Sequence, residues 1–479
     1  MSSFADETRW LDATAQAELV SSGQVNPLQL VDAAIERVER YDGALNALTY
    51  RWFEQARELA GSAVLPEGPF KGVPYLLKDL YSNEAGKPIS NGNKAYKEAG
   101  YIADADTTLV SRYKAAGLIS LGRTNSPELG SVPVTEPEAW GPTRNPWNLE
   151  RTPGGSSGGA AAAVAAGIVP IAHASDGGGS IRIPASCCGL VGLKPSQGRI
   201  SMGPFRDESN LGVEHCVSRT VRDSALLLDA THGPGIGDSV IAPAPRRPFI
   251  QEVGIDPGRL RIGLLDHSPR GFTTDKECVL GVHKSAKLLE SLGHIVEESW
   301  PEILGDNSAG KTFAGLWSTN MGMALRRFAE TLGREMTIDD VELMNWAQAE
   351  FARELSAVDY AAALAASLSF RRSVQGWWEQ GWDLLLTPTL AAPPIAVGTI
   401  RNDSSRPMAP LMTAGGWVTF TGQFNMSGQP AISLPLHQTS DGLPVGIQLV
   451  AAYGREDLLF QVASQLEQAA PWAHLTPNL

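Results

Sequence analysis

The sequence lacks the features that mark secreted, nucleic-acid-binding or metal-binding proteins. It has only 4 cysteines in 479 residues, two of them adjacent at Cys187 and Cys188, so we expect buried thiols rather than a disulfide framework. The formal net charge is −13 and there is no basic run, which argues against nucleic acid as a partner. The 8 histidines show no metal-ligand spacing, so we expect no metal and no cofactor.

Long apolar runs are also missing. No apolar stretch reaches the ~18 residues that a membrane-spanning helix needs. The first twenty residues, MSSFADETRWLDATAQAELV, contain no basic stretch followed by an apolar core. We therefore expect no membrane partner and a cytoplasmic location.

Glycine and proline are plentiful, at 49 and 32 residues, which indicates many turns. Between the turns, helix-like and strand-like patterns alternate along the chain. This alternation predicts an α/β protein: a single large domain, residues 1–479, with a mixed central β-sheet covered by helices. The main predicted helical segments are 11–60 with a break at 23–27, 108–116, 276–292, 305–380 and 455–469, and the predicted strands include 71–80, 118–122 and 261–265.

Lys78 ends the short apolar run KGVPYLLKDL, residues 71–80. Lysine is rarely buried without a partner. Here it is either a lysine that reaches solvent from the end of a strand or a functional group in a dry cleft. The run alone leaves both interpretations open.

The loop GGSSGG at 154–159 places Ser156 in a G-x-S-x-G pattern, which in α/β-hydrolases carries the nucleophile. The preceding residues, RNPWNLERTP, do not have the strand pattern that such a nucleophile requires. A serine that caps the following small-residue helix is the structural alternative.

The stretch SDGGGS at 175–180 contains three consecutive glycines, which lose much backbone entropy on folding unless close approach or unusual dihedral angles require them. The N–H groups of Gly177, Gly178, Gly179 and Ser180 could surround a negative oxygen, as an oxyanion hole does. Phosphate is the rival ligand, but no G-K-[ST] motif follows.

Together the three sites resemble the amidase signature family. VPYLLKDL, GGSSGG and SDGGGSIRIPASCCGLVGLKPS match the lysine strand, the serine loop and the signature core of that family. GRTNSPELG, FNMSGQPAISLP and DGLPVGIQLVA extend the resemblance over nearly the whole chain. It implies the amidase signature fold, with a signature core at about 70–220 and a substrate-side helical region at about 302–420.

The resemblance also implies a Ser-cisSer-Lys triad that hydrolyses an amide through an acyl-enzyme. Ser180 would be the nucleophile, Ser156 the relay serine beside a non-proline cis peptide, and Lys78 the base. The N–H groups of residues 177 to 180 would form the oxyanion hole. The family usually has threonine at the position of Gly177, so we expect a wider approach to Ser180. The partner would be a small-molecule amide, and relatives suggest a homodimer.

The substrate is less well defined than the reaction. Long stretches such as TEPEAWGPTRNPWNL resemble members that act on nylon oligomers. Other amidases, for aryl amides, peptide amides or carbamates, remain alternatives, as do a glutamyl-tRNA amidotransferase A subunit and a non-catalytic binding protein. Six aromatic residues are candidates for lining an apolar cleft, although most are expected to be core: Trp317, Trp377, Trp378, Trp382, Trp417 and Phe424.

Overall fold

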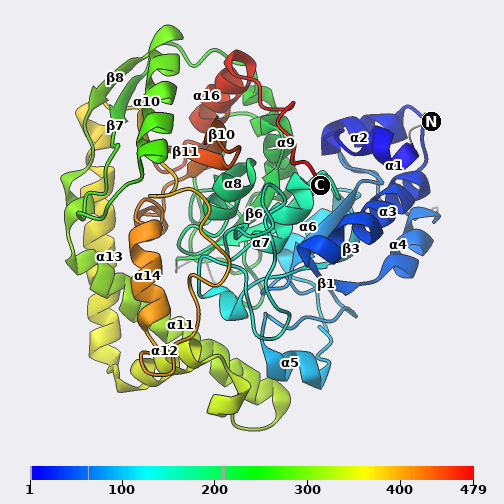
Figure 1. The fold of residues 1–479 in the computed structure, drawn as a ribbon, viewed down its shortest axis with the longest axis horizontal. Helices are drawn as coiled ribbons and strands as arrows, with labels where there is room; N and C mark the ends of the chain where they lie inside the picture. Colours follow the sequence, from blue (N-terminus) through cyan, green and yellow to red (C-terminus); the bar gives the residue numbers. More distant parts are fainter. Residues whose placement is uncertain (1–2, 63, 207–210) are drawn as a thin grey trace.

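The computed structural model describes residues 3–62, 64–206 and 211–479 (Figure 1). In these residues, one mixed sheet of 11 strands has the order β1-β3-β2-β4-β6-β5-β10-β11-β9-β7-β8. The predicted α/β fold with a mixed sheet is confirmed. The strands are β1 (Leu48–Arg51), β2 (Pro74–Lys78), β3 (Ile119–Thr124), β4 (Ile171–Asp176), β5 (Val191–Lys194), β6 (Val213–Ser218), β7 (Arg261–Leu264), β8 (Ile295–Glu298), β9 (Leu384–Pro388), β10 (Ala431–Gln438) and β11 (Pro444–Ala451).

Helices cover both faces of the sheet (Figure 1). One apolar core joins the strands to α6, α9, α10 and α16, and the other joins them to α3, α4, α7 and α8. The helices are α1 (Phe4–Thr8), α2 (Ala13–Ser21), α3 (Pro27–Leu45), α4 (Phe53–Ala60), α5 (Lys94–Ala99), α6 (Thr108–Ala115), α7 (Gly158–Ala165), α8 (Arg182–Cys188), α9 (Val221–Thr231), α10 (Lys276–Ser291), α11 (Ser308–Leu332), α12 (Leu343–Glu354), α13 (Ala357–Gln375), α14 (Ala409–Trp417), α15 (Gln423–Met426) and α16 (Glu456–Ala469).

Several of these elements follow directly from local sequence. α3 begins where predicted, because Asn26 accepts a hydrogen bond from the backbone N–H of Gln29, the Gln29 side chain accepts one from the backbone N–H of Asn26, and Pro27 occupies the first turn. The prediction of continuous helix up to residue 60 is wrong at Leu48–Arg51. These residues form β1, which pairs with β3 at the edge of the sheet.

Alternation along β2 decides where Lys78 lies. Tyr75 and Leu77 belong to the core with α6 and α9, whereas Leu76 belongs to the core with α7 and α8. Because successive strand residues point to opposite faces, Lys78 shares the face of Leu76. Its side chain is therefore directed toward the start of α7 and α8, where the two serine-containing loops lie.

The predicted helical region contains α11, α12 and α13, and α11 packs against both of the other two (Figure 1). Aromatic side chains of α11, α13 and the segment after α13 form a separate apolar cluster with β9 and α15. No helix in the described ranges is both long and apolar enough to cross a membrane.

Candidate active site

Lys78 is completely buried at the end of β2, so the interpretation of a lysine that reaches solvent is wrong. Its Nζ lies 2.7 Å from Oγ of Ser156 and 2.9 Å from Oγ of Ser175. Burial lowers the pKa of Lys78 to about 7, although the carboxylates of Glu214 and Asp176 oppose this shift. At neutral pH a large share of Lys78 is therefore an uncharged amine, which can accept a proton.

Ser156 lies in the loop before α7, and the peptide bond between Gly155 and Ser156 is cis, as the resemblance implies. Gly155 fits only because it has no side chain: a Cβ there would lie 2.7 Å from backbone atoms of Val134. The N-cap of α7 is Ser157, which makes no capping hydrogen bond. Ser156 is thus not a helix cap, and its hydroxyl is directed to Lys78.

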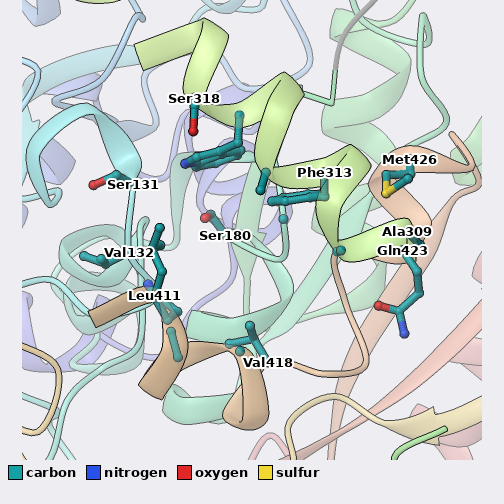
Figure 2. Close-up of a pocket in the computed structure, with 18 of the residues that line it drawn as sticks. Ser131, Val132, Ser180, Ala309, Phe313, Ser318, Leu411, Val418, Gln423 and Met426 are labelled. Atoms are coloured by element: carbon teal, nitrogen blue, oxygen red, sulfur yellow. The ribbon is translucent and has the colours of Figure 1, made fainter. Parts of the chain in front are cut away.

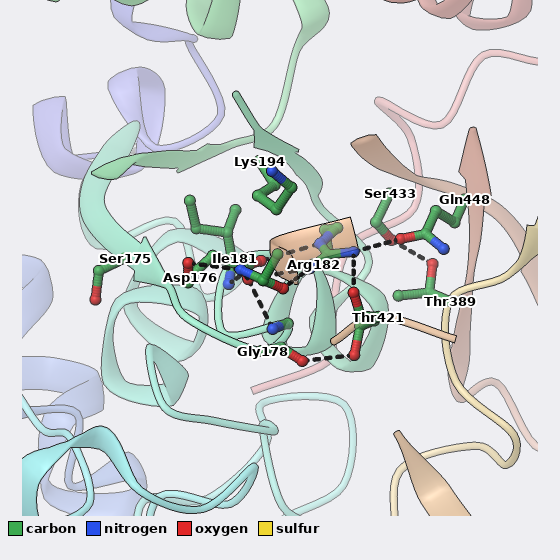
Figure 3. Close-up of polar contacts among 12 residues, drawn as sticks. Ser175, Asp176, Gly178, Ile181, Arg182, Lys194, Thr389, Thr421, Ser433 and Gln448 are labelled. Carbon is green, nitrogen blue, oxygen red and sulfur yellow. Dashed lines mark hydrogen bonds and ion pairs between the residues drawn. The ribbon is translucent and has the colours of Figure 1, made fainter. Parts of the chain in front are cut away.

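The triple-glycine bend is held by a buried ion pair between Asp176 and Arg182 (Figure 3). Asp176 Oδ2 lies 3.0 Å from Nε of Arg182, and Oδ1 accepts a hydrogen bond of 2.7 Å from the N–H of Gly179. Burial raises the pKa of Asp176, but the charge of Arg182 outweighs it and brings the pKa to about 2. Asp176 is therefore a carboxylate that fixes the loop carrying Ser180.

Gly179 has φ +133, and a Cβ there would lie 2.5 Å from Oγ1 of Thr421. Thr421 in turn donates a hydrogen bond of 2.7 Å to the carbonyl of Gly178 (Figure 3). Glycine is therefore required at Gly179 because Thr421 lies so close to its backbone. The three consecutive glycines of SDGGGS had predicted that a neighbouring group lies against the backbone here.

The predicted set of four oxyanion donors needs one correction. The N–H of Gly179 donates to Asp176, so it stabilises the bend and is not available to a ligand. The N–H groups of Gly177, Gly178 and Ser180 have no protein acceptor within the described residues. These three remain the predicted donors.

Two cavities meet at Ser180. The apolar cavity, about 300 Å³, lies between α11, α14 and the loop at Val132, and Figure 2 shows Ser180 between Phe313 and Leu411. The polar cavity, about 180 Å³, contains the hydroxyls of Ser156 and Ser175 and the side chain of Arg206. Gly130, Ser180 and Trp317 line both cavities. Ser180 therefore borders both spaces.

The expectation of a wider approach at Gly177 is wrong, because an aromatic pair occupies the space. A Cβ at Gly177 would lie 3.0 Å from Cζ3 of Trp317, and one at Gly178 would lie 3.2 Å from Cζ of Phe313. The two rings stack with centroids 5.4 Å apart. Of the six aromatic candidates, Trp317 alone lines these two cavities, and the others are buried: Trp377, Trp378, Trp382, Trp417 and Phe424.

Three polar groups near Lys78 were not predicted from the sequence: Ser175, His173 and Glu214. His173 and Ser175 alternate along β4, and Glu214 lies opposite Ser175 on β6. Alternation in IAHASD was a signal that His173 and Ser175 share a face, but the β4–β6 pairing could not be read locally. In the described part of the chain, no group of three His, Cys, Asp or Glu side chains is arranged to hold a metal ion.

The chain is similar to known hydrolases over nearly its whole length. A family model described as Amidase matches residues 29–460. A 6-aminohexanoate-cyclic-dimer hydrolase of Paenarthrobacter ureafaciens is 45% identical over 480 residues, which cover 98% of this chain and 97% of that protein. A solved structure of 6-aminohexanoate cyclic dimer hydrolase matches with a TM-score of 0.94 at 45% identity, covering 98% of this chain and 99% of the other. The structure of a bacterial aryl acylamidase matches with a TM-score of 0.86 at 29% identity, covering 97% of each chain.

Proposed function

The chain belongs to the amidase family, and from this premise we propose that it is a serine hydrolase of 6-aminohexanoate cyclic dimer or related nylon oligomers. The observation that carries the proposal is the buried amine of Lys78, 2.7 Å from the Ser156 hydroxyl and beside the cavity that Ser180 lines. The substrate rests on the relatives of that name.

The proton path follows from the contacts of Lys78. As a neutral amine, Lys78 accepts the proton of Ser156 and donates one of its own hydrogens to Ser175, 2.9 Å away. Ser156 then accepts the proton of Ser180, whose oxygen forms a bond to the amide carbon. The proton returns through Ser156 to the departing amine as the C–N bond breaks. Water hydrolyses the remaining ester at Ser180.

The oxyanion of the tetrahedral intermediate would be bound by the N–H groups of Gly177, Gly178 and Ser180. These donors are held in place before the substrate arrives, because Asp176 and Arg182 fix the bend from behind. A preorganised donor of this kind contributes roughly 3 kcal/mol to the stability of the transition state.

The apolar cavity supports an oligoamide with polymethylene chains. Its walls include Val132, Phe313, Leu411 and Met426, and few charged groups reach it. Its volume of about 300 Å³ is at the lower end of small-molecule sites, which span roughly 300–1,000 Å³. A neutral amide with apolar spacers satisfies such walls better than a charged substrate.

The test is product analysis by mass spectrometry after incubation with the cyclic dimer, a linear dimer, an aryl anilide, a urethane and glutamine. We expect the cyclic dimer to gain one water and become linear. Cleavage of the anilide alone would mean that the protein is a hydrolase with a different substrate, one like that of the aryl acylamidase. Glutamine cleavage alone would point to an amidotransferase subunit, and no cleavage at all would overturn the proposal.

Gly177→Thr should lower kcat/KM at least tenfold, because its side chain must displace Trp317, 3.0 Å from the position of Cβ. Trp317→Ala in the same chain should recover part of this loss by giving the threonine space. The measurement is kcat/KM for both single variants and the double variant. Strictly additive losses would show that the two positions do not compete for space.

We further propose a cytoplasmic homodimer. All four cysteines are buried free thiols, which fits a reducing compartment. Light scattering of the purified protein tests the dimer.

A further inference from the structure

A chain of buried polar groups lies behind Lys78. The backbone N–H of Lys78 donates to Nδ1 of His173 at 3.3 Å. Nε2 of His173 lies 2.8 Å from Oε2 of Glu214, and the other carboxylate oxygen accepts a hydrogen bond of 2.6 Å from Arg206. These contacts connect the strand end that carries Lys78 to a carboxylate on β6 and to a cation at the rim of the polar cavity.

The hydrogen-bond partners of His173 and Glu214 determine where the protons lie in this chain of polar groups. Burial lowers the pKa of His173, so its ring is neutral. Because Nδ1 accepts from Lys78, the single proton is on Nε2 and is donated to Glu214. Burial raises the pKa of Glu214, but the hydrogen bond from His173 and the charge of Arg206 bring it below its usual value. Glu214 is therefore a buried carboxylate.

Three charged groups act on the Lys78 amine. Glu214 of β6 and Asp176 at the end of β4 favour the ammonium form, and Arg206 disfavours it. The negative charge of Asp176 is already balanced by the positive charge of Arg182 in their ion pair. Arg123 of β3 acts on His173, and Arg327 of α11 also lines the polar cavity. Glu214 and Arg206 are thus the adjustable pair, with opposite effects on the same amine.

We propose that Arg206, Glu214 and His173 are positioning residues for the base: they orient the strand end at Lys78 and set the pH at which Lys78 loses its proton. This rests on the proposed function, in which only the neutral amine accepts a proton from Ser156. None of the three needs to touch the substrate for this role. Their effect on the reaction is exerted through Lys78.

The sign of each charge gives opposite predictions. Glu214→Gln removes a negative charge, so the ammonium form is less stable and the acid limb of kcat/KM moves to lower pH. Arg206→Met removes a positive charge, so the limb moves to higher pH. Each shift should be about one pH unit, as expected for one charge in low-dielectric surroundings. The double variant should return the limb close to that of the unchanged protein.

The experiment measures kcat/KM for the cyclic dimer from pH 5 to 9 for the unchanged protein, the two single variants and the double variant. This profile reports the pKa of groups in the free enzyme. Glu277→Gln is the matched control, because Glu277 pairs with His437 at 3.0 Å but lines neither cavity. We expect its limb not to move. Melting temperatures identify any variant that does not fold, and Arg206→Met still decides if Glu214→Gln does not fold.

The outcomes separate this inference from the proposed function. Shifts in the same direction, or lower rates with an unmoved limb, would overturn the positioning role while the hydrolase remains. If kcat/KM of the unchanged protein did not fall toward low pH, or fell equally in Lys78→Met, the proposed role of Lys78 as base would be overturned. A purely structural role of the chain lowers kcat in both variants and moves neither limb.

Discussion

Ser180→Ala is expected to lower kcat/KM for the cyclic dimer by at least about 10⁴-fold, because Ser180 is the proposed nucleophile that forms the acyl-enzyme. Ser180 lies at the junction of the two cavities and its loop is fixed by Asp176 and Arg182. The substitution removes one oxygen and leaves these contacts in place, so the melting temperature should not change. The measurement is turnover with product detection by mass spectrometry.

The adjacent residues Ser156 and Ser157 provide a second test and its matched control. Ser156→Ala removes the proposed relay hydroxyl, which lies 2.7 Å from Nζ of Lys78, and should lower the rate by roughly 10²–10⁴-fold. Ser157→Ala removes a hydroxyl that contacts the backbone of Ser175 at 3.3 Å, and its rate should stay within a few-fold. A Ser180→Ala protein that still turned over, or equal losses for Ser156 and Ser157, would contradict the assignment.

Local signals predicted the elements that carry the proposed triad. The apolar run before Lys78 gave β2, and the small residues after the serine loop gave α7. Both are patterns that a short window contains. The glycine bend was also visible, because three consecutive glycines are costly to order and indicate a backbone that must lie close to its neighbours. What placed these pieces together was the sheet order, which no local pattern contains.

The strand β6 was not predicted, and its sequence shows why. VEHCVS contains Glu214 and His215, which are polar but completely or almost completely buried. Each is tolerated because it has a partner from elsewhere: Glu214 has His173, and His215 has Ser224 at 3.0 Å. A pattern of alternating hydrophobicity cannot reveal a strand whose polar groups are satisfied by distant residues.

The site was predicted only as far as its chemistry is local. Lys78, Ser156 and Ser180 were found from three motifs, and the structure brings Lys78 to Ser156 and places Ser180 in the same cavity. The expected open space at Gly177 was wrong, because Trp317 comes from a helix more than a hundred residues further along the chain. The shape of a cavity depends on such distant side chains, and so does substrate choice.

Lys78→Met is expected to reduce the rate by roughly 10³-fold or more at neutral pH, because the proton of Ser156 then has no acceptor. In the unchanged protein, kcat/KM should rise about tenfold per pH unit below pH 7 and become constant above it, since the pKa of Lys78 is about 7. The variant should lose this rise. The measurement is kcat/KM from pH 5 to 9 for both proteins.

Replacing Lys78 should affect stability and activity in opposite directions. The pKa of Lys78 is lowered from 10.5 in the unfolded chain to about 7 in the folded one. Between these values the unfolded chain binds the extra proton, so the unfolding free energy rises with pH across that window. At pH 7 and below the full cost of burying the charge remains, on the order of a few kcal/mol.

Lys78→Met removes this cost, so its melting temperature at pH 6 should be equal to or above that of the unchanged protein. The difference should shrink as the pH approaches 10. A variant that is inactive and also much less stable at pH 6 would show that Lys78 serves the fold. An inactive variant that is no less stable would show that the buried amine is kept for its chemistry, at the expense of stability.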